Sequence, residues 1–364
     1  MNICILGDAG SVHLQQLVPR LAAHGHGVHI VTHKPAEVPG ATVERFKVPD
    51  AGLTNPRRWA GRRAQYLRGF LRRFHVVNVH FLHDWGLTPD VLDAGCLVAT
   101  PWGSDIVPPP DASVPETLVQ YRRMLLRHAA CVTTWGPRFA EQVAAFAGLD
   151  PTSIALAPLG VDTNLFRPDR PRSHRLARPA RVGFFKGFRA VYGAWYLVRA
   201  IPRVVHRRPG TRFELVGDGS ELASCRRLAD ALGVSGDITW IARQPHHQLP
   251  SRLAGWDLSI VPSLSESFGA AALESSAMRV PIVASNVGGL ADTVHHGETG
   301  LLVPPADPDA LADAILALLA DAPRRRRMGD AGRAMVARRY EWDAIVAHWV
   351  AAYEHALDHT SVCV

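Results

Sequence analysis

Short apolar runs alternate with stretches of helical periodicity along the whole chain. In its first half, strand-like runs rich in β-branched residues lie at 2–7, 27–32, 41–48, 76–81, 96–100, 131–135 and 154–160. Several of them are apolar at nearly every position, which is typical of strands with both sheet faces covered. Their regular alternation with helical segments predicts a parallel, doubly wound α/β sheet.

A stretch rich in proline and arginine then interrupts the alternation, and we predict the interdomain linker at 166–180. Strand-like runs resume at 181–185, 212–219, 238–242, 258–263, 281–286 and 300–304. The pattern therefore predicts two tandem Rossmann-like domains, at 1–165 and 181–340. We expect the C-terminal helical segment, 341–364, to pack back toward the first domain.

The bulk properties agree with two globular domains. The chain has 364 residues, of which 47% are hydrophobic and 20% charged. It has no apolar run of about 18 residues and no signal-peptide pattern at its start, so we expect a cytoplasmic protein. Its five cysteines are scattered without a C-x-x-C pair and are expected to be buried thiols. A net charge of +7 favours anionic partners, but no aromatic platform or recognition-helix pattern indicates nucleic acid.

The stretch PSLSESFGAAALE, at 262–274, has glycine and three alanines where a packing helix would carry larger side chains. We predict that Ser267 is the N-cap of a helix that follows a strand. The backbone N–H groups of Phe268, Gly269 and Ala270 would then be free to bind phosphate. The small side chains would allow a bulky ligand to come close.

Two glutamates flank this helix start. Glu266 precedes it and Glu274 lies inside it, eight residues later, a span of about 12 Å at ~1.5 Å per residue. A carboxylate beside a phosphate is costly unless it accepts hydrogen bonds, so sugar hydroxyls are the expected partners. The alternative is an ordinary capped helix with two surface glutamates.

These residues carry a specific resemblance. The motif E-S-F-G-x4-E, together with PLGVDTNLFRP (158–168), LVGDG (215–219) and the glycine-containing segment 286–315, resembles the retaining, GT-B-fold glycosyltransferases of family four. The resemblance implies two Rossmann-like domains facing a cleft, with the acceptor on the first and the nucleotide sugar on the second. It further implies that Glu266 contacts the donor sugar, that Glu274 holds the ribose, and that the amides after Glu266 contact sugar and phosphate.

The same resemblance raises a question about positive charge. A diphosphate leaving group needs cationic stabilisation, and the family commonly places an arginine after the first strand of the second domain. Here Phe184 takes that position, whereas a family variant matches Lys186. The second usual lysine aligns with Val191 or Tyr192, and Arg189 is the nearest substitute. The alternative is that Lys186 and Arg189 are solvated loop cations.

In the first domain, the family resemblance points to loops that follow strands. Gly10 and Ser11 fit loosely a small-residue loop whose amides approach the donor phosphate or the acceptor, and His13 is a candidate on the acceptor side. The family histidine that contacts the donor sugar matches His80, with His83 as its neighbour on the acceptor side. For His13, the alternative is a polar residue in the first helical turn.

The loop TPWGSD, at 100–105, resembles a family loop and makes Ser104 and Asp105 candidates on the acceptor side. The alternative for both is a cap within the loop. The run DPD, at 307–309, mimics a metal-binding D-x-D, but it precedes a helix and is better explained as a cap. We therefore predict no metal site and no cofactor.

A basic, aromatic segment at 55–74 contains seven arginines and no acidic residue. Trp59, Tyr66, Phe70 and Phe74 recur in it at helical spacing. Such a helix can lie on anionic lipid, at the inner membrane face. The alternative is that the aromatic stripe packs on the first sheet while the arginines are solvated, since every helix of this fold must bury one face.

The combined prediction is a retaining hexosyltransferase that uses a nucleoside-diphosphate sugar, with uridine ahead of guanosine, and needs no metal. Its acceptor would be a glycan, a lipid-linked glycan or a small metabolite. Two alternatives remain open: a nucleotide-sugar 2-epimerase, and a nucleotide-sugar-binding protein without catalysis.

Overall fold

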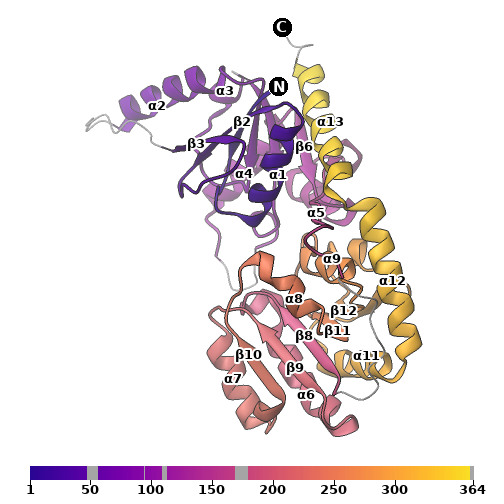
Figure 1. Ribbon diagram of the computed structural model, residues 1–364. Helices are drawn as coiled ribbons and strands as arrows, with labels where there is room; N and C mark the ends of the chain where they lie inside the picture. Colours follow the sequence, from indigo (N-terminus) through magenta and orange to yellow (C-terminus); the bar gives the residue numbers. More distant parts are fainter. Residues whose placement is uncertain (47–55, 94, 109–112, 169–178, 361–364) are drawn as a thin grey trace. The chain divides into compact units, whose positions relative to one another are not determined.

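The computed structural model describes residues 1–46, 56–93, 95–108, 113–168 and 179–360, with the side chains of 56–63 and 90 outside the description (Figure 1). The chain divides into two compact units. The first contains Met1–Leu159 and Trp342–Val364, and the second contains Gly160–Glu341.

The first unit is built on a seven-stranded parallel sheet with the order β3-β2-β1-β4-β5-β6-β7. Its strands are β1 (Asn2–Leu6), β2 (Gly27–Thr32), β3 (Ala41–Arg45), β4 (Val76–His80), β5 (Cys96–Thr100), β6 (Cys131–Thr134) and β7 (Ala155–Leu156). The chain runs outward from β1 to β3 and then returns to start again at β4. The order therefore reverses between β1 and β4, and ligands of doubly wound sheets bind beyond the strand ends at such a point.

Helices cover this sheet: α1 (Val12–Ala23), α2 (Pro56–Leu71), α3 (Pro89–Leu92), α4 (Glu116–His128), α5 (Pro137–Ala147) and, from the end of the chain, α13 (Trp342–Thr360). Helix α13 buries Trp342, Trp349 and Tyr353. The Tyr353 hydroxyl accepts a hydrogen bond from Asn78 Nδ2 on β4 at 2.9 Å. The C-terminal helix is thus an integral layer of the first unit.

The second unit has a six-stranded parallel sheet with the order β10-β9-β8-β11-β12-β13. Its strands are β8 (Arg181–Phe185), β9 (Arg212–Val216), β10 (Ile238–Ile241), β11 (Leu258–Val261), β12 (Ile282–Ser285) and β13 (Gly300–Val303). The helices are α6 (Ala194–Arg207), α7 (Leu222–Ala231), α8 (Leu249–Leu253), α9 (Ala270–Ala277), α10 (Leu290–Thr293), α11 (Pro308–Ala320) and α12 (Ala322–Arg339), with short 3-10 turns at η2 (Ala190–Tyr192) and η4 (His246–Gln248). Here the strand order reverses between β8 and β11.

The two doubly wound parallel sheets confirm the predicted fold class. The boundary between the units differs from the predicted one, because residues 160–165 belong to the second unit. Val161 N donates to Tyr340 O at 2.7 Å, and the Arg333 guanidinium donates to Phe166 O at 2.8 Å. Of the predicted linker, residues 169–178 lie outside the described residues.

Four of the five cysteines are described, and all four are buried free thiols. Burial raises the pKa of each, to about 11 for Cys131 and Cys225. This agrees with the prediction of buried thiols, and Cys363 lies outside the described residues. Among the helices that the structure describes, none is both long enough and apolar enough to cross a membrane.

Candidate active site

Lys186 and Glu266 form a half-buried ion pair at the point where the second sheet reverses its order. Lys186 follows β8 and Glu266 follows β11, and these two strands are hydrogen-bonded neighbours. The Lys186 ammonium donates to the Glu266 carboxylate, with the side chains 14% and 12% exposed. The ammonium also lies 4.3 Å from the centre of the Tyr192 ring. Lys186 is therefore not a solvated loop cation, because both the carboxylate and the aromatic face hold it in place.

The structure shows what surrounds the residues that depart from the family pattern. Phe184 is fully buried in the core of the second unit and packs against Phe188, with ring centres 5.5 Å apart. Tyr192, one of the two positions that match the missing lysine, presents its ring to the ammonium of Lys186. Arg189 is exposed, and its carbonyl accepts the Tyr192 N–H at 2.9 Å. Of the two predicted cations, Lys186 is therefore the one that pairs with Glu266.

The loop after β11 leads into α9, and the helix begins later than predicted. Its first residue is Ala270, and the N-cap is Gly269, whose φ of 100° favours glycine. The prediction that Ser267 caps the helix is wrong, because the left-handed backbone at Gly269 sets the start. Ser267 is half-exposed and Phe268 is buried in the loop. The N-terminus of α9 follows the carboxyl end of β11, and the free N–H groups of a helix N-terminus favour phosphate.

Gly288 and Gly289 pack closely against the backbone of the loop that carries Glu266. Gly289 N donates to Glu266 O at 2.9 Å. A Cβ added at Gly288 would lie 2.2 Å from Glu266 O, and one at Gly289 would lie 2.3 Å from Ser267 O. Only a residue without a side chain allows this backbone approach. The motif was visible in the sequence, but its role as a support for Glu266 was not predicted.

Glu274 lies on α9, and its carboxylate is paired with a histidine that the sequence analysis did not single out. His246 Nε2, in η4, lies 2.7 Å from Glu274 Oε1. The two side chains are 22% and 14% exposed. Phe166 packs against the imidazole with ring centres 5.1 Å apart. Burial lowers the pKa of His246, but the hydrogen bond and charge of Glu274, with the charge of Asp162, outweigh it and raise the pKa above its ordinary value.

In the first unit, His80 ends β4 beside the point where that sheet reverses. It is 1% exposed, and its Nδ1 accepts a hydrogen bond from Trp102 Nε1 at 3.2 Å. Trp349 stacks on the ring at 5.5 Å. Burial, and then the charge of His13, lowers the pKa of His80 to about 3, so the ring is neutral. Because Nδ1 accepts, Nε2 carries the proton, and this buried donor has no hydrogen-bond partner among the residues that the structure describes.

The other candidates of the first unit occupy the neighbouring strand ends. Gly10 is exposed, and its N–H donates to Asp8 Oδ1 at 2.9 Å, so that amide is already engaged. Ser11 is the N-cap of α1, accepting from Leu14 N at 3.1 Å. His13 contacts the Trp102 ring at 5.1 Å.

His83 is exposed and follows Phe81, whose φ of 57° is strained for a non-glycine residue. Although the residue is exposed, neighbouring atoms exclude water from part of its ring, and this desolvation, followed by the charge of Arg122, lowers the pKa of His83. The strain lies directly after His80, at the end of β4. Together His80, Phe81 and His83 form a constrained strand end at the reversal point.

Asp105 proves to be an anchor of its loop. It is fully buried, and its carboxylate accepts backbone N–H groups of Leu82, Trp102 and Gly103 at 2.8–3.2 Å. The structure thus favours the alternative of a loop cap over a contact with an acceptor, because these amides already surround the carboxylate. Ser104 beside it is exposed.

The 307–309 run is a helix cap, as predicted. Asp307 is the N-cap of α11 and accepts from Ala310 N at 2.9 Å, and Asp309 pairs with Arg203 at 2.9 Å. Across the described parts of the chain, no three histidine, cysteine, aspartate or glutamate side chains gather as they would around a metal ion.

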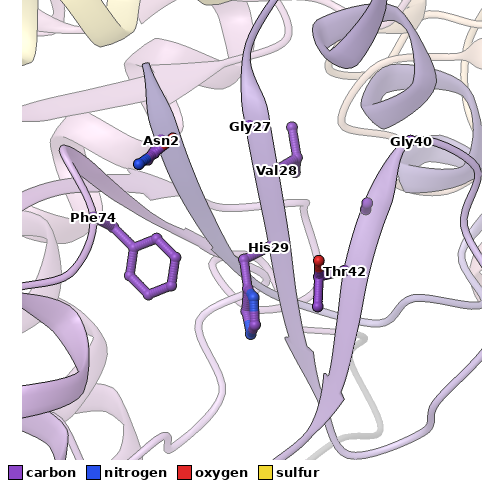
Figure 2. A pocket seen from close by; sticks show the side chains of 8 residues that line it. Asn2, Gly27, Val28, His29, Gly40, Thr42 and Phe74 are labelled. Carbon is purple, nitrogen blue, oxygen red and sulfur yellow. The ribbon is translucent and has the colours of Figure 1, made fainter.

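An open hollow of about 470 Å³ lies in the first unit at the amino-terminal ends of β1, β2 and β3 (Figure 2). It is lined by Asn2, Gly27, Val28, His29, Gly40, Ala41, Thr42 and Phe74. Asn2, Gly27 and Ala41 are the first residues of their strands. Since ligands of such sheets bind at the carboxyl ends, this hollow is not the candidate site.

The described part of the basic segment 55–74 packs on the first unit. Phe70 is 9% exposed and Leu67 is 3% exposed, and Arg73 lies over the ring of Phe70 at 5.3 Å. Tyr66 is 39% exposed. The packing alternative holds for Phe70, whereas Tyr66 is exposed and the side chain of Trp59 lies outside the description.

Two family descriptions match this chain. The model described as Glycosyltransferase Family 4 matches residues 10–165, and the model described as Glycosyl transferases group 1 matches residues 167–335. The two matches follow the two units and together span most of the chain.

Curated relatives and a solved structure give the same picture. A GDP-mannose-dependent alpha-(1-6)-phosphatidylinositol monomannoside mannosyltransferase of Mycobacterium tuberculosis is 34% identical over 208 residues, which cover 54% of this chain and 54% of that protein. A D-inositol 3-phosphate glycosyltransferase of Mycobacterium bovis is 37% identical over 228 residues, covering 60% and 47%. The alignments span about half the length of these relatives. The structure of Anabaena HepE in complex with UDP matches with a TM-score of 0.78 at 19% identity, covering 96% of this chain and 99% of that one.

Proposed function

Because the chain belongs to glycosyltransferase family 4 and has the GT-B fold, we propose that it is a retaining glycosyltransferase. It moves a hexose from a nucleoside-diphosphate sugar to an acceptor hydroxyl. The observation that carries the proposal is the arrangement after β8 and β11. There a half-buried cation and a carboxylate follow two neighbouring strands of one sheet, and the start of α9 with its second carboxylate comes next in the chain.

Each part of this arrangement matches a part of the donor. The first N–H groups of α9 and the Lys186 ammonium suit a diphosphate. Glu266 suits the sugar hydroxyls, because a carboxylate near phosphate needs hydroxyl donors. Glu274 suits the two hydroxyls of the ribose. The Lys186–Glu266 pair already places the cation beside the carboxylate that would hold the sugar.

In the proposed reaction, the bond between C1 of the sugar and the diphosphate oxygen breaks while the acceptor oxygen bonds to C1 on the same face. The acceptor proton passes to an oxygen of the leaving diphosphate. Negative charge grows on that diphosphate as the bond breaks, and Lys186 stabilises it there. Lys186 thereby contributes more in the transition state than in the ground state, which is the condition for raising the rate. We also propose that His80 contacts the donor sugar, and its neutral ring offers one N–H, at Nε2, for this contact.

The donor nucleotide is proposed to be uridine or guanosine diphosphate. One relative is named for GDP-mannose, and HepE was solved with UDP. The names of the relatives also include phosphatidylinositol mannoside and inositol phosphate. We therefore propose an acceptor that carries several hydroxyls, either lipid-linked or free. We also propose that the transfer needs no metal, because the charge of Lys186 and the α9 amides can neutralise the diphosphate.

Product analysis tests the proposal. The purified protein is incubated with UDP-glucose, UDP-N-acetylglucosamine or GDP-mannose, with and without inositol phosphate or a lipid extract. We expect nucleoside diphosphate and an α-linked product only when acceptor is present, and the same yield in a chelator. A changed sugar without acceptor would indicate the epimerase, and the absence of any turnover would indicate a binding protein. Loss of activity in chelator with recovery in manganese would overturn the metal-free mechanism.

A matched pair of variants connects the activity to the site. We expect Glu266→Gln to abolish most transfer. Glu298→Gln, which changes an exposed glutamate of the same unit, should leave the activity unchanged. If both variants lose activity equally, the assignment of the site to the end of β11 is wrong.

The basic segment 55–74 adds a proposal on membrane contact. Arg72 and Arg73 are exposed at the end of α2, and clustered arginines are attracted to anionic lipid. We expect the protein to bind anionic vesicles more strongly than neutral ones at low salt. Equal binding to both would contradict this contact.

A further inference from the structure

His246 and Glu274 form a largely buried pair in the second unit. The two side chains come from η4 and α9, 28 residues apart in sequence, and meet at 2.7 Å. Since a carboxylate only accepts hydrogen bonds, His246 Nε2 carries the proton in this contact. Phe166 packs on the imidazole and limits its rotation. One carboxylate oxygen is therefore held by a fixed donor.

This contact leaves capacity for a second partner. A carboxylate has two oxygens and about four acceptor positions, and His246 uses one position on Oε1. A vicinal diol needs an acceptor that is already oriented, because immobilising a free side chain costs binding free energy. A fixed donor on one oxygen supplies that orientation.

The pair also changes the charge that a phosphate meets. With neutral His246 the pair carries one negative charge, which repels a diphosphate bound at the start of the same helix. With protonated His246 the pair is neutral. The charged groups that face the imidazole are Glu274 from α9 and Asp162 from the loop before the second unit's sheet. Asp162 also accepts the N–H groups of Asn164 and Leu165 at 3.0 and 2.9 Å.

We propose that His246 is a positioning residue that orients Glu274 for the ribose hydroxyls and, when protonated, cancels its charge, so that nucleoside diphosphates bind more tightly at low pH. This inference rests on the proposed function, since it assumes that Glu274 holds the ribose. It assigns a second pocket residue and a pH dependence to the donor site.

The first experiment measures the dissociation constants of UDP and GDP by calorimetry between pH 6 and pH 8.5. The variants are His246→Gln, which keeps an N–H donor but cannot be protonated, and His246→Ala, which removes both. The control is His247→Gln, an exposed neighbour. Because the protonation of the free ligand is the same for every protein, the ratio of each variant's constant to that of the wild type reports on the protein alone.

We expect His246→Gln to bind about threefold to tenfold more weakly than the wild type at pH 6, the size of one partly screened charge interaction near the protein surface. The ratio should approach one as the pH rises and wild-type His246 loses its proton. His246→Ala should be weaker at every pH, and His247→Gln should match the wild type throughout. A pH-independent ratio for His246→Gln, or an equal effect of His247→Gln, would overturn the inference.

A second measurement does not depend on any ligand. The titration of the His246 ring proton is followed by NMR, with the resonance identified by its loss in His246→Gln. We expect Glu274→Gln to lower the pKa of His246, because it removes the facing charge. An unchanged pKa would overturn the inference.

The outcomes separate the two proposals. If the wild type binds neither nucleotide, the proposed function and this inference fail together. If the wild type binds a nucleotide and the His246 variants show no pH-dependent difference, only the inference fails.

Discussion

Gly289 lies against the loop that carries Glu266, and replacing it with alanine tests the geometry of the proposed site. Its φ of −63° suits any residue, so alanine introduces no backbone strain. The added Cβ would lie 2.3 Å from Ser267 O and 2.6 Å from Phe268 Cα. The substitution therefore acts through steric contact with the loop that carries Glu266.

The required displacement follows from these distances. Real Cβ atoms essentially never approach another atom closer than 3.0 Å, so the 2.3 Å contact must open by at least 0.7 Å, the difference of the two. A shift of about 1 Å at a reacting centre can cost about a hundredfold in rate. We therefore expect kcat/KM for transfer to fall by about tenfold to a hundredfold. Glu274 lies more than one helical turn after this loop, in α9, so its position should change little. The affinity for nucleoside diphosphate should therefore change much less than kcat/KM.

The assay compares kcat/KM and the nucleotide dissociation constant for the wild type, Gly289→Ala and a control. The control is Gly236→Ala in the same unit, because a Cβ there would meet nothing within 4 Å. We expect Gly236→Ala to match the wild type in both quantities. Gly289→Ala should also lose about 1–3 kcal/mol of stability, as is typical of overpacking.

One result would refute this reasoning. If Gly289→Ala is folded and its kcat/KM equals that of Gly236→Ala, the loop position does not control transfer. An equal loss in both variants would point to a general sensitivity of the unit and not to the contact with Ser267.

Three further predictions follow from the same contacts. Lys186→Met should lower kcat/KM by about a hundredfold or more, while the nucleotide affinity changes less, because the lysine charge stabilises the leaving diphosphate. Steady-state kinetics measures kcat/KM, and calorimetry measures the nucleotide affinity. Tyr353→Phe should cost about 1–3 kcal/mol in urea unfolding, since Asn78 Nδ2 loses its buried acceptor, and an unchanged midpoint would count against the bond. The pKa of His80 is about 3 in the folded state, so the unfolded chain takes up the proton first as the pH falls below about 6.5. The wild type should then lose about 2 kcal/mol relative to His80→Gln between pH 7 and pH 5, measured by hydrogen exchange of β4, and parallel losses in both would refute it.

The sequence predicted the fold because each buried parallel strand leaves a strong local signal. The runs at 76–81 and 96–100 are apolar on both faces, and they form the central strands β4 and β5. Of the run at 154–160, only Ala155–Leu156 forms a strand, at the edge of the sheet. The last helix carries three buried aromatic residues, which explains its place in the first unit.

The candidate site could be predicted only in part. Glu266 and Glu274 lie in a contiguous motif, and their spacing is a local property. The helix start was misplaced at Ser267, because the φ of Gly269 depends on the packing of Leu290 and Thr293 around it. His246 was missed because a contact between residues 28 positions apart leaves no periodicity in the sequence. Asp105 was placed on the acceptor side, although three backbone amides already occupy it.

The contact between Tyr192 and Lys186 was also not predictable from the sequence. The resemblance to the family places a second lysine at Val191 or Tyr192, and this chain has none there. The structure places the Tyr192 ring under the Lys186 ammonium, where it stabilises the cation that remains. The chain thus lacks the second family lysine, but it keeps Lys186 and holds its ammonium against the ring of Tyr192.

The central claim is that Glu274 and the start of α9 bind a nucleoside diphosphate. Its most direct test is the thermal shift of the wild type and Glu274→Ala with uridine, guanosine, adenosine and thymidine diphosphates. At one hundred times its dissociation constant, the correct nucleotide should stabilise the wild type by about 2.7 kcal/mol, and it should stabilise Glu274→Ala far less. No shift with any nucleotide, or the same shift in both proteins, would contradict the account.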